Sequence, residues 1–98
     1  MNEQEHLLTI LMEECGEVIK GCAKIQRFGA EDTAPFSDVT NMVKLETEMN
    51  QVVAVYFMYL KAKGIQHEED FDIGIIEAKV TKVRKWMEYS RRNGTLDD

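Results

Sequence analysis

Residues 52–60 read VVAVYFMYL, in which two tyrosine hydroxyls are the only polar side-chain groups. Upstream, apolar residues recur at a helical spacing of three or four at Met42, Leu45 and Met49. With Gly64 as a stop signal, the pattern predicts one helix over residues 39–63. The second half of this helix is apolar on every side and must be covered on every side. Two further helices in one short chain cannot provide that cover, which predicts that a second copy packs against it.

Two more helical patterns flank this one. The first extends over residues 3–27 and ends at Gly29, with an apolar seam formed by Leu8, Leu11, Cys15, Val18, Cys22 and Ile25. The last extends over residues 73–92 and ends at Gly94, with a buried stripe expected at Ile76, Val80, Val83 and Met87. The prediction is an all-α fold in a single domain over residues 1–98. It is a helical bundle of three main helices per chain, completed by oligomerisation.

The connections between these helices are polar or contain helix breakers. A loop over residues 29–38 contains the only proline, Pro35, and Ser37 or Asp38 is expected to cap the helix that follows. Residues 65–72, which include the letters HEEDFD, are predicted to form an acidic connection. Residues 94–98 are expected to form a frayed tail.

The composition restricts the size and the partners of the protein. Its 98 residues suffice for one domain, and its net charge of −6 argues against nucleic-acid binding, which rests on many basic side chains. The charge is uneven, since residues 79–92 hold six of the twelve basic residues and one acid. That stretch therefore carries +5 and the rest of the chain −11. Such a basic helix is either a solvated face or a partner for phosphate groups.

The sequence also predicts a cytoplasmic protein that does not contact the membrane. Glu3 and Glu5 stand where a secretory signal would carry basic residues. The apolar run over residues 52–60 is too short to cross a bilayer. Cys15 and Cys22 are separated by roughly 10 Å along a helix axis, too far for a disulfide. They are expected to pack as reduced, small hydrophobic residues.

Acidic residues on the first helix suggest chemistry. Glu14 and Glu17 are three residues apart, so their carboxylates share one face, which borders the apolar seam. Two acids at the edge of a core repel each other and lose hydration unless a cation compensates. Gly16 and Gly21 each cost about 0.5–1 kcal/mol in a helix interior, which is reasonable where a helix or a ligand approaches closely.

The second helix carries a matching polar pair, Glu48 and Gln51, which also borders an apolar stripe. If the two helices pack antiparallel, these side chains and those of Glu14 and Glu17 can converge. A site built from oxygen ligands suits Mg²⁺ or Mn²⁺ and not zinc, and Mg²⁺ usually works with phosphates. On the third helix, a face carrying Lys79, Lys82 and Trp86 can steady phosphate oxygens and stack on a base, or can be a plain amphipathic surface.

The chain resembles a known family at these positions. Residues 13–29 read EECGEVIKGCAKIQRFG and residues 45–60 read LETEMNQVVAVYFMYL. They are similar to the MazG-like branch of the all-α nucleoside triphosphate pyrophosphohydrolases, which carry an E-x-x-E pair on one helix and an E-x-x-D pair on a later one. The likeness covers residues 7–87 in layout, and its specific part is the two acidic helices.

The resemblance implies an enzyme that cleaves an NTP or dNTP to the monophosphate and pyrophosphate with Mg²⁺, as a homo-oligomer (dimer or tetramer). It implies that Glu14, Glu17 and Glu48 hold the metal and act in catalysis. Gln51 stands where the family has Asp and would be a neutral ligand. It also implies that Lys79 and Lys82 contact phosphates.

Two alternatives remain open on the sequence. The first is a weakly active or inactive helical oligomer that acts as a nucleotide-binding or interaction module, which Gln51 favours. The second is a phosphoribosyl-ATP pyrophosphohydrolase on the same kind of scaffold. The identity of the general base is open as well, between the metal-binding carboxylates and Glu13 acting through water.

Overall fold

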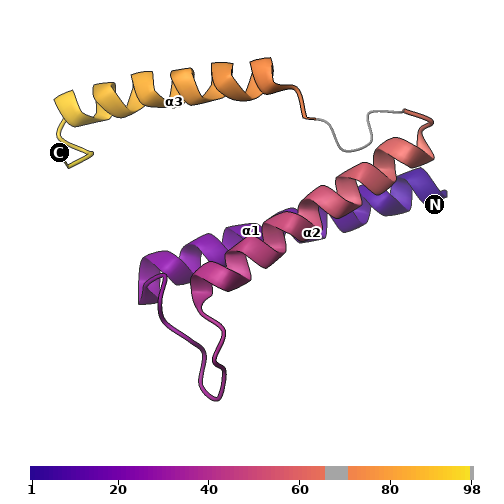
Figure 1. Cartoon of the computed structure of the whole chain (residues 1–98), viewed down its shortest axis with the longest axis horizontal. Coiled ribbons are helices and arrows are strands. Elements are labelled where there is room, and N and C mark those ends of the chain that lie inside the picture. The colour runs from indigo at the N-terminus through magenta and orange to yellow at the C-terminus, as the bar shows by residue number, and fades with distance from the viewer. Residues whose placement is uncertain (66–70, 98) are drawn as a thin grey trace. The chain divides into compact units, whose positions relative to one another are not determined.

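The computed structural model describes residues 1–65 and 71–97, and within these ranges all regular secondary structure is helical. The helices are α1 (Glu3–Phe28), α2 (Asn41–Ala62) and α3 (Ile73–Arg92), shown in Figure 1. The predicted all-α fold with three main helices is therefore confirmed. Most of the predicted acidic connection, residues 66–70, lies outside the described residues. The chain divides into two compact units, Met1–Glu68 with α1 and α2, and Glu69–Asp98 with α3.

Helix α1 begins and ends where local capping chemistry allows. The Asn2 side chain accepts a hydrogen bond from the Glu5 backbone N–H (2.8 Å), and two acids in the first turn suit the helix dipole. At the other end Gly29 adopts a φ of 96°, a conformation that other residues rarely adopt. Its N–H donates to the Ile25 carbonyl (2.8 Å). The predicted span is confirmed to within one residue.

The start of α2 is set by the loop before it. Thr40, and neither Ser37 nor Asp38, is the N-cap, and its side chain accepts from the Val43 N–H (3.1 Å). The predicted start at residue 39 and the predicted cap are therefore wrong. The reason is an antiparallel bridge between Thr33 and Thr40, which holds the loop closed up to the first residue of the helix.

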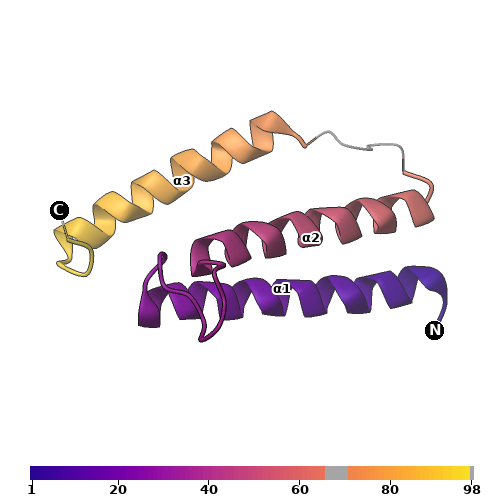
Figure 2. The ribbon, with the colours of Figure 1, turned by 60° about the horizontal axis from the view of Figure 1, so that its bottom comes forward.

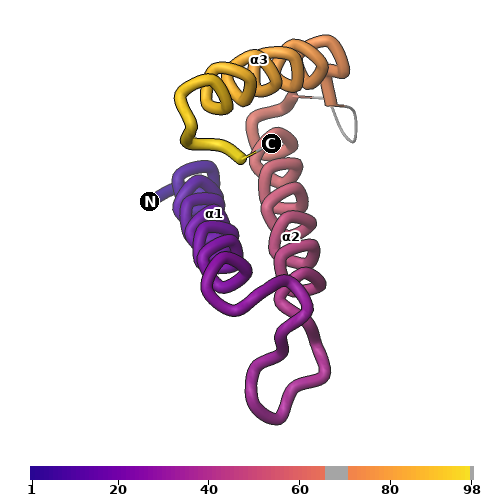
Figure 3. Tube along the Cα trace, turned by 90° about the vertical axis from the view of Figure 1, so that its left-hand side faces the viewer, coloured from indigo at the N-terminus to yellow at the C-terminus, as the bar shows by residue number. Residues whose placement is uncertain are grey.

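Helices α1 and α2 form an antiparallel hairpin, seen from three directions in Figures 1, 2 and 3. A hydrogen bond ties each end. The Gln4 side-chain amide donates to the Ala62 carbonyl (3.1 Å), and the buried Asn41 amide donates to the Gly29 carbonyl (3.0 Å). These two contacts pair the start of α1 with the end of α2, and the end of α1 with the start of α2. They fix the antiparallel arrangement of the hairpin.

The face of α1 that meets α2 lies one residue around the helix from the predicted seam. Leu7 and Gly21 are buried, whereas Leu8 is 40% exposed and Cys15 and Cys22 are exposed free thiols. The expected packing of the two cysteines is therefore wrong. Gly21 has no side chain, which leaves room on this face of α1 for side chains of α2.

A second apolar stripe on the hairpin is not covered within the hairpin unit itself. On α2 the side chains of Met42, Met49 and Tyr56 are 38, 46 and 38% exposed. They recur every seven residues, which is close to two helical turns, so they lie on one side of α2. Among the residues that the structure describes, only Leu7 and Leu60 are buried hydrophobic side chains. One hairpin therefore has very little core of its own.

The second unit is a single helix with a folded end. The predicted span of α3 is confirmed, and Asp72 caps it by accepting from the Ile75 N–H (3.1 Å). The second unit by itself buries no residue of α3, so it does not cover the stripe that was predicted to be buried. Beyond α3, the backbone N–H groups of Thr95 and Leu96 donate to the Ser90 carbonyl (3.0 and 3.3 Å), so the expected frayed tail turns back at these two residues. No helix in the described part of the chain is long and apolar enough to cross a membrane.

Candidate functional site

One contact between α1 and α2 places a carboxylate against a glycine. A Cβ atom built on Gly21 would lie 2.6 Å from Oε2 of Glu48 and 3.4 Å from Cδ1 of Leu45. Only a glycine at this position of α1 leaves the Glu48 carboxylate where it lies. The cost of Gly21 in a helix interior thus has a local cause, which is room for an acidic side chain from the neighbouring helix.

Glu48 Oε2 is buried and has no hydrogen-bond partner among the described residues. A carboxylate oxygen that is removed from water without a partner is strongly unfavourable. Such an orphaned acceptor usually indicates a missing ion, water or ligand. The position of this oxygen is the strongest sign of a ligand site on the hairpin.

The other predicted ligands lie along the same part of the hairpin. Glu14 is half-buried and lies seven residues before Gly21, on the face that meets α2. Glu17 lies one turn before Gly21, but its side chain is 52% exposed and pairs with Lys20 at 3.8 Å. An exposed pair of this kind contributes little to stability, so Glu17 is free to exchange Lys20 for another cation.

Gln51 is exposed and follows Glu48 by three residues, about one turn along α2. In the described residues no three His, Cys, Asp or Glu side chains lie close enough together to hold a metal ion. Glu48 meets α1 at Gly21, while Glu17 faces Lys20. A cation held by these carboxylates together therefore requires acidic side chains to move from the positions that they occupy here.

The donor set on the hairpin consists of oxygens only. Carboxylates and an amide carbonyl are the ligands that Mg²⁺ and Mn²⁺ prefer. No family model, curated protein or solved structure matches the chain. The functional inference therefore rests on the residues themselves, and an unpartnered carboxylate oxygen with further acids along the same hairpin fits a hard divalent cation.

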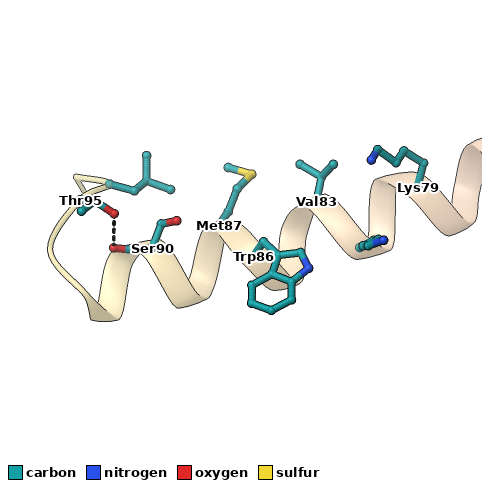
Figure 4. A pocket seen from close by; sticks show the side chains of 8 residues that line it. Lys79, Val83, Trp86, Met87, Ser90 and Thr95 are labelled. Carbon is teal, nitrogen blue, oxygen red and sulfur yellow. Dashed lines mark hydrogen bonds between the residues drawn. The ribbon is translucent and has the colours of Figure 1, made fainter.

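The three residues predicted on α3 share one surface. Lys79, Lys82 and Trp86 line a hollow of about 400 Å³ that extends past Met87 and Ser90 to the folded end (Figure 4). The Trp86 ring meets the Tyr89 ring edge-on, with 5.4 Å between the ring centroids. The Lys85 ammonium lies 5.5 Å from the centroid of the Trp86 ring. This surface belongs to the second unit and combines two cations with an aromatic face.

A further hollow on the hairpin was not predicted. It has a volume of about 240 Å³ and is lined by Lys24 and Phe28 of α1, by the loop around Pro35, and by Lys44 of α2. In the sequence, Lys24 follows Gly21 by three residues and Lys44 precedes Glu48 by four. These spacings indicate a shared hollow only when the contact between Gly21 and Glu48 is known.

Proposed function

We propose that the protein is a cytoplasmic, Mg²⁺-dependent pyrophosphohydrolase that cleaves an NTP or dNTP to the nucleoside monophosphate and pyrophosphate. The observation that carries the proposal is the buried Oε2 of Glu48, which has no partner in the described residues and lies against Gly21. The resemblance to the MazG-like family, with its acidic pairs on two helices, supports the same reaction.

The acids supply the ligands of the cation. Glu48 would hold it from α2, and Glu14 and Glu17 from α1, with Gln51 as a neutral ligand or a group that positions water. When bound, Mg²⁺ supplies a Lewis acid that draws charge from phosphate oxygens and lowers the pKa of a bound water. Mn²⁺ accepts the same ligands.

The reaction consumes one water. Its oxygen would form a bond to the α phosphorus as the bond from that phosphorus to the oxygen bridging the α and β phosphates breaks. Pyrophosphate leaves with the bridging oxygen, and a proton of the water passes to a carboxylate of the site. The carboxylates therefore have two roles, since they neutralise the cation and accept the proton. On α3, Lys79, Lys82 and Trp86 offer two cations and an aromatic face to a nucleotide.

The proposal is tested by measuring pyrophosphate release from a panel of NTPs and dNTPs. We expect release that requires Mg²⁺, stops on addition of EDTA and is lost in Glu17→Ala. Release should be lost because Glu17 is one of the proposed ligands of the cation. Its present partner, Lys20, forms only an exposed ion pair with it and does not hold it away from the cation. Absence of release from every nucleotide, with Mn²⁺ tried as well, would contradict the proposal. Phosphoribosyl-ATP in the same panel separates the related activity.

We also propose that the working form is a homo-oligomer, a dimer or a tetramer. The uncovered stripe of Met42, Met49 and Tyr56, with the exposed Leu8 on α1, supports this, since one hairpin buries only two hydrophobic side chains in the described residues. A second hairpin is the simplest cover for such a stripe, because the same apolar surface on both copies can pack against itself.

Met49→Lys is expected to shift the protein toward the monomer and to lower its melting temperature by several degrees, since it places a charge in the stripe. Light scattering after size-exclusion chromatography measures the mass. Thr47→Lys is the matched control, because Thr47 is exposed on another side of α2 and should leave the mass unchanged. A wild-type protein that is monomeric at micromolar concentration would contradict the oligomer.

A further inference from the structure

We propose that the hollow between Lys24 and Lys44 is an anion site that binds the polyphosphate of the nucleotide. The inference rests on the proposed function for the identity of its ligand. The hollow, about 240 Å³ in volume, lies where the end of α1, the loop and the start of α2 meet. All of these segments belong to one compact unit.

The two lysines lie on the loop side of the contact between Gly21 and Glu48. Lys24 lies one turn beyond Gly21 on α1, and Lys44 one turn before Glu48 on α2, both toward the loop. The contact between Gly21 and Glu48 is therefore followed, one turn away, by a cation from each helix. A cation held at Glu48 and phosphate oxygens held by these ammonium groups would be neighbours, as a metal-bound polyphosphate requires.

The charges in the hollow are available to a ligand. Within the described residues, neither Lys24 nor Lys44 forms an ion pair, whereas Lys20 does so with Glu17 at 3.8 Å. Asp32 is the single acid on the lining, so the hollow carries a net positive charge in a chain of net charge −6. A local excess of positive charge in an acidic protein is typical of a site for an anion.

Backbone groups do not compete with the lysines for this role. The first four N–H groups of α2 already donate, to Asp32, Ala30 and Thr40. The anion must therefore be held by the ammonium groups. Phe28 and Pro35 form an apolar part of the lining.

The size of the hollow favours a free nucleotide over a nucleic acid. Its volume is in the range of a few phosphate groups, and nucleic-acid backbones are bound by extended basic surfaces that an acidic chain lacks. The geometry points to the β and γ phosphates in the hollow, held as the departing pyrophosphate. The nucleoside then extends the other way along the hairpin, past Glu48.

The test is a calorimetric titration of the full chain with tripolyphosphate, with and without Mg²⁺. We expect binding by the wild type and a loss of about 100-fold in the double variant Lys24→Gln/Lys44→Gln, at about tenfold for each charged contact. The matched control is Lys61→Gln/Lys63→Gln, which removes the same charge from the exposed far end of α2 and should change affinity less than about twofold. Circular dichroism checks that both variants keep their helices.

Equal affinity of the wild type and Lys24→Gln/Lys44→Gln, or no binding of tripolyphosphate under either condition, would overturn the inference. The two proposals can fail separately. If nucleotides are hydrolysed and the KM is unchanged in Lys24→Gln/Lys44→Gln, the anion site is wrong and the hydrolase remains. If no nucleotide is hydrolysed but tripolyphosphate binding still depends on the two lysines, the anion site remains and the hydrolase is wrong.

Discussion

Glu48→Gln is expected to reduce Mg²⁺-dependent pyrophosphate release by about 10³-fold, because a Lewis acid contributes several kcal/mol to such a reaction. The substitution keeps the shape of the side chain and removes its charge. In the folded protein Oε2 of Glu48 is buried without a partner in the described residues, so removing the charge also removes an unfavourable term. We therefore expect the metal-free variant to be at least as stable as the wild type.

Thermal denaturation with and without Mg²⁺ separates these two effects. Mg²⁺ that binds only the folded state raises the melting temperature of the wild type, and this increase should be absent in Glu48→Gln. Glu46→Gln is the control, since Glu46 is exposed and lies about 200° around α2 from Glu48. Retention of activity by Glu48→Gln would rule out its carboxylate as a ligand. An equal loss in Glu46→Gln would mean that net charge, and not one ligand, controls activity.

Gly21→Ala is expected to lower turnover by about 10–100-fold with little change in stability. The new methyl group would meet Oε2 of Glu48 at 2.6 Å, so this carboxylate must move. It is the far end of a flexible side chain and can move without disturbing the helices. The loss of activity therefore comes from a misplaced ligand, which measurements of the Mg²⁺ dependence of turnover should show as a weaker metal affinity.

Gly16→Ala provides the matched control for this prediction. Gly16 is also within α1, and a Cβ atom built there meets nothing within 4 Å in the described structure. Gly16→Ala should gain about 0.5–1 kcal/mol of helix stability, a gain that the contact with Glu48 offsets in Gly21→Ala, and only Gly21→Ala should affect turnover. Equal activity in the two variants would show that the contact between Gly21 and Glu48 has no part in the reaction.

The sequence alone determined the number, type and most of the limits of the helices. The span of α3 matches its prediction, and α1 differs by one residue. Asn2, Gly29 and Asp72 act on their own or nearby backbone groups, so their effects can be read from neighbouring residues. The start of α2 was predicted wrongly because Thr40 becomes the cap through a bridge to Thr33, which is formed by the closed loop.

Only the tertiary structure decided which faces of the helices meet. Leu11, Val18 and Ile25 belong to both candidate faces of α1, so apolar spacing could not choose between Leu7–Gly21 and Leu8–Cys22 as the contact. The choice depends on how closely α2 can approach, which is set by the missing side chain of Gly21 and by Glu48 on the other helix. The acidic pairs were visible in the sequence because they repeat at helical spacing. The unpartnered oxygen of Glu48 and the hollow between Lys24 and Lys44 were not, because each is made by two segments that are distant in the chain.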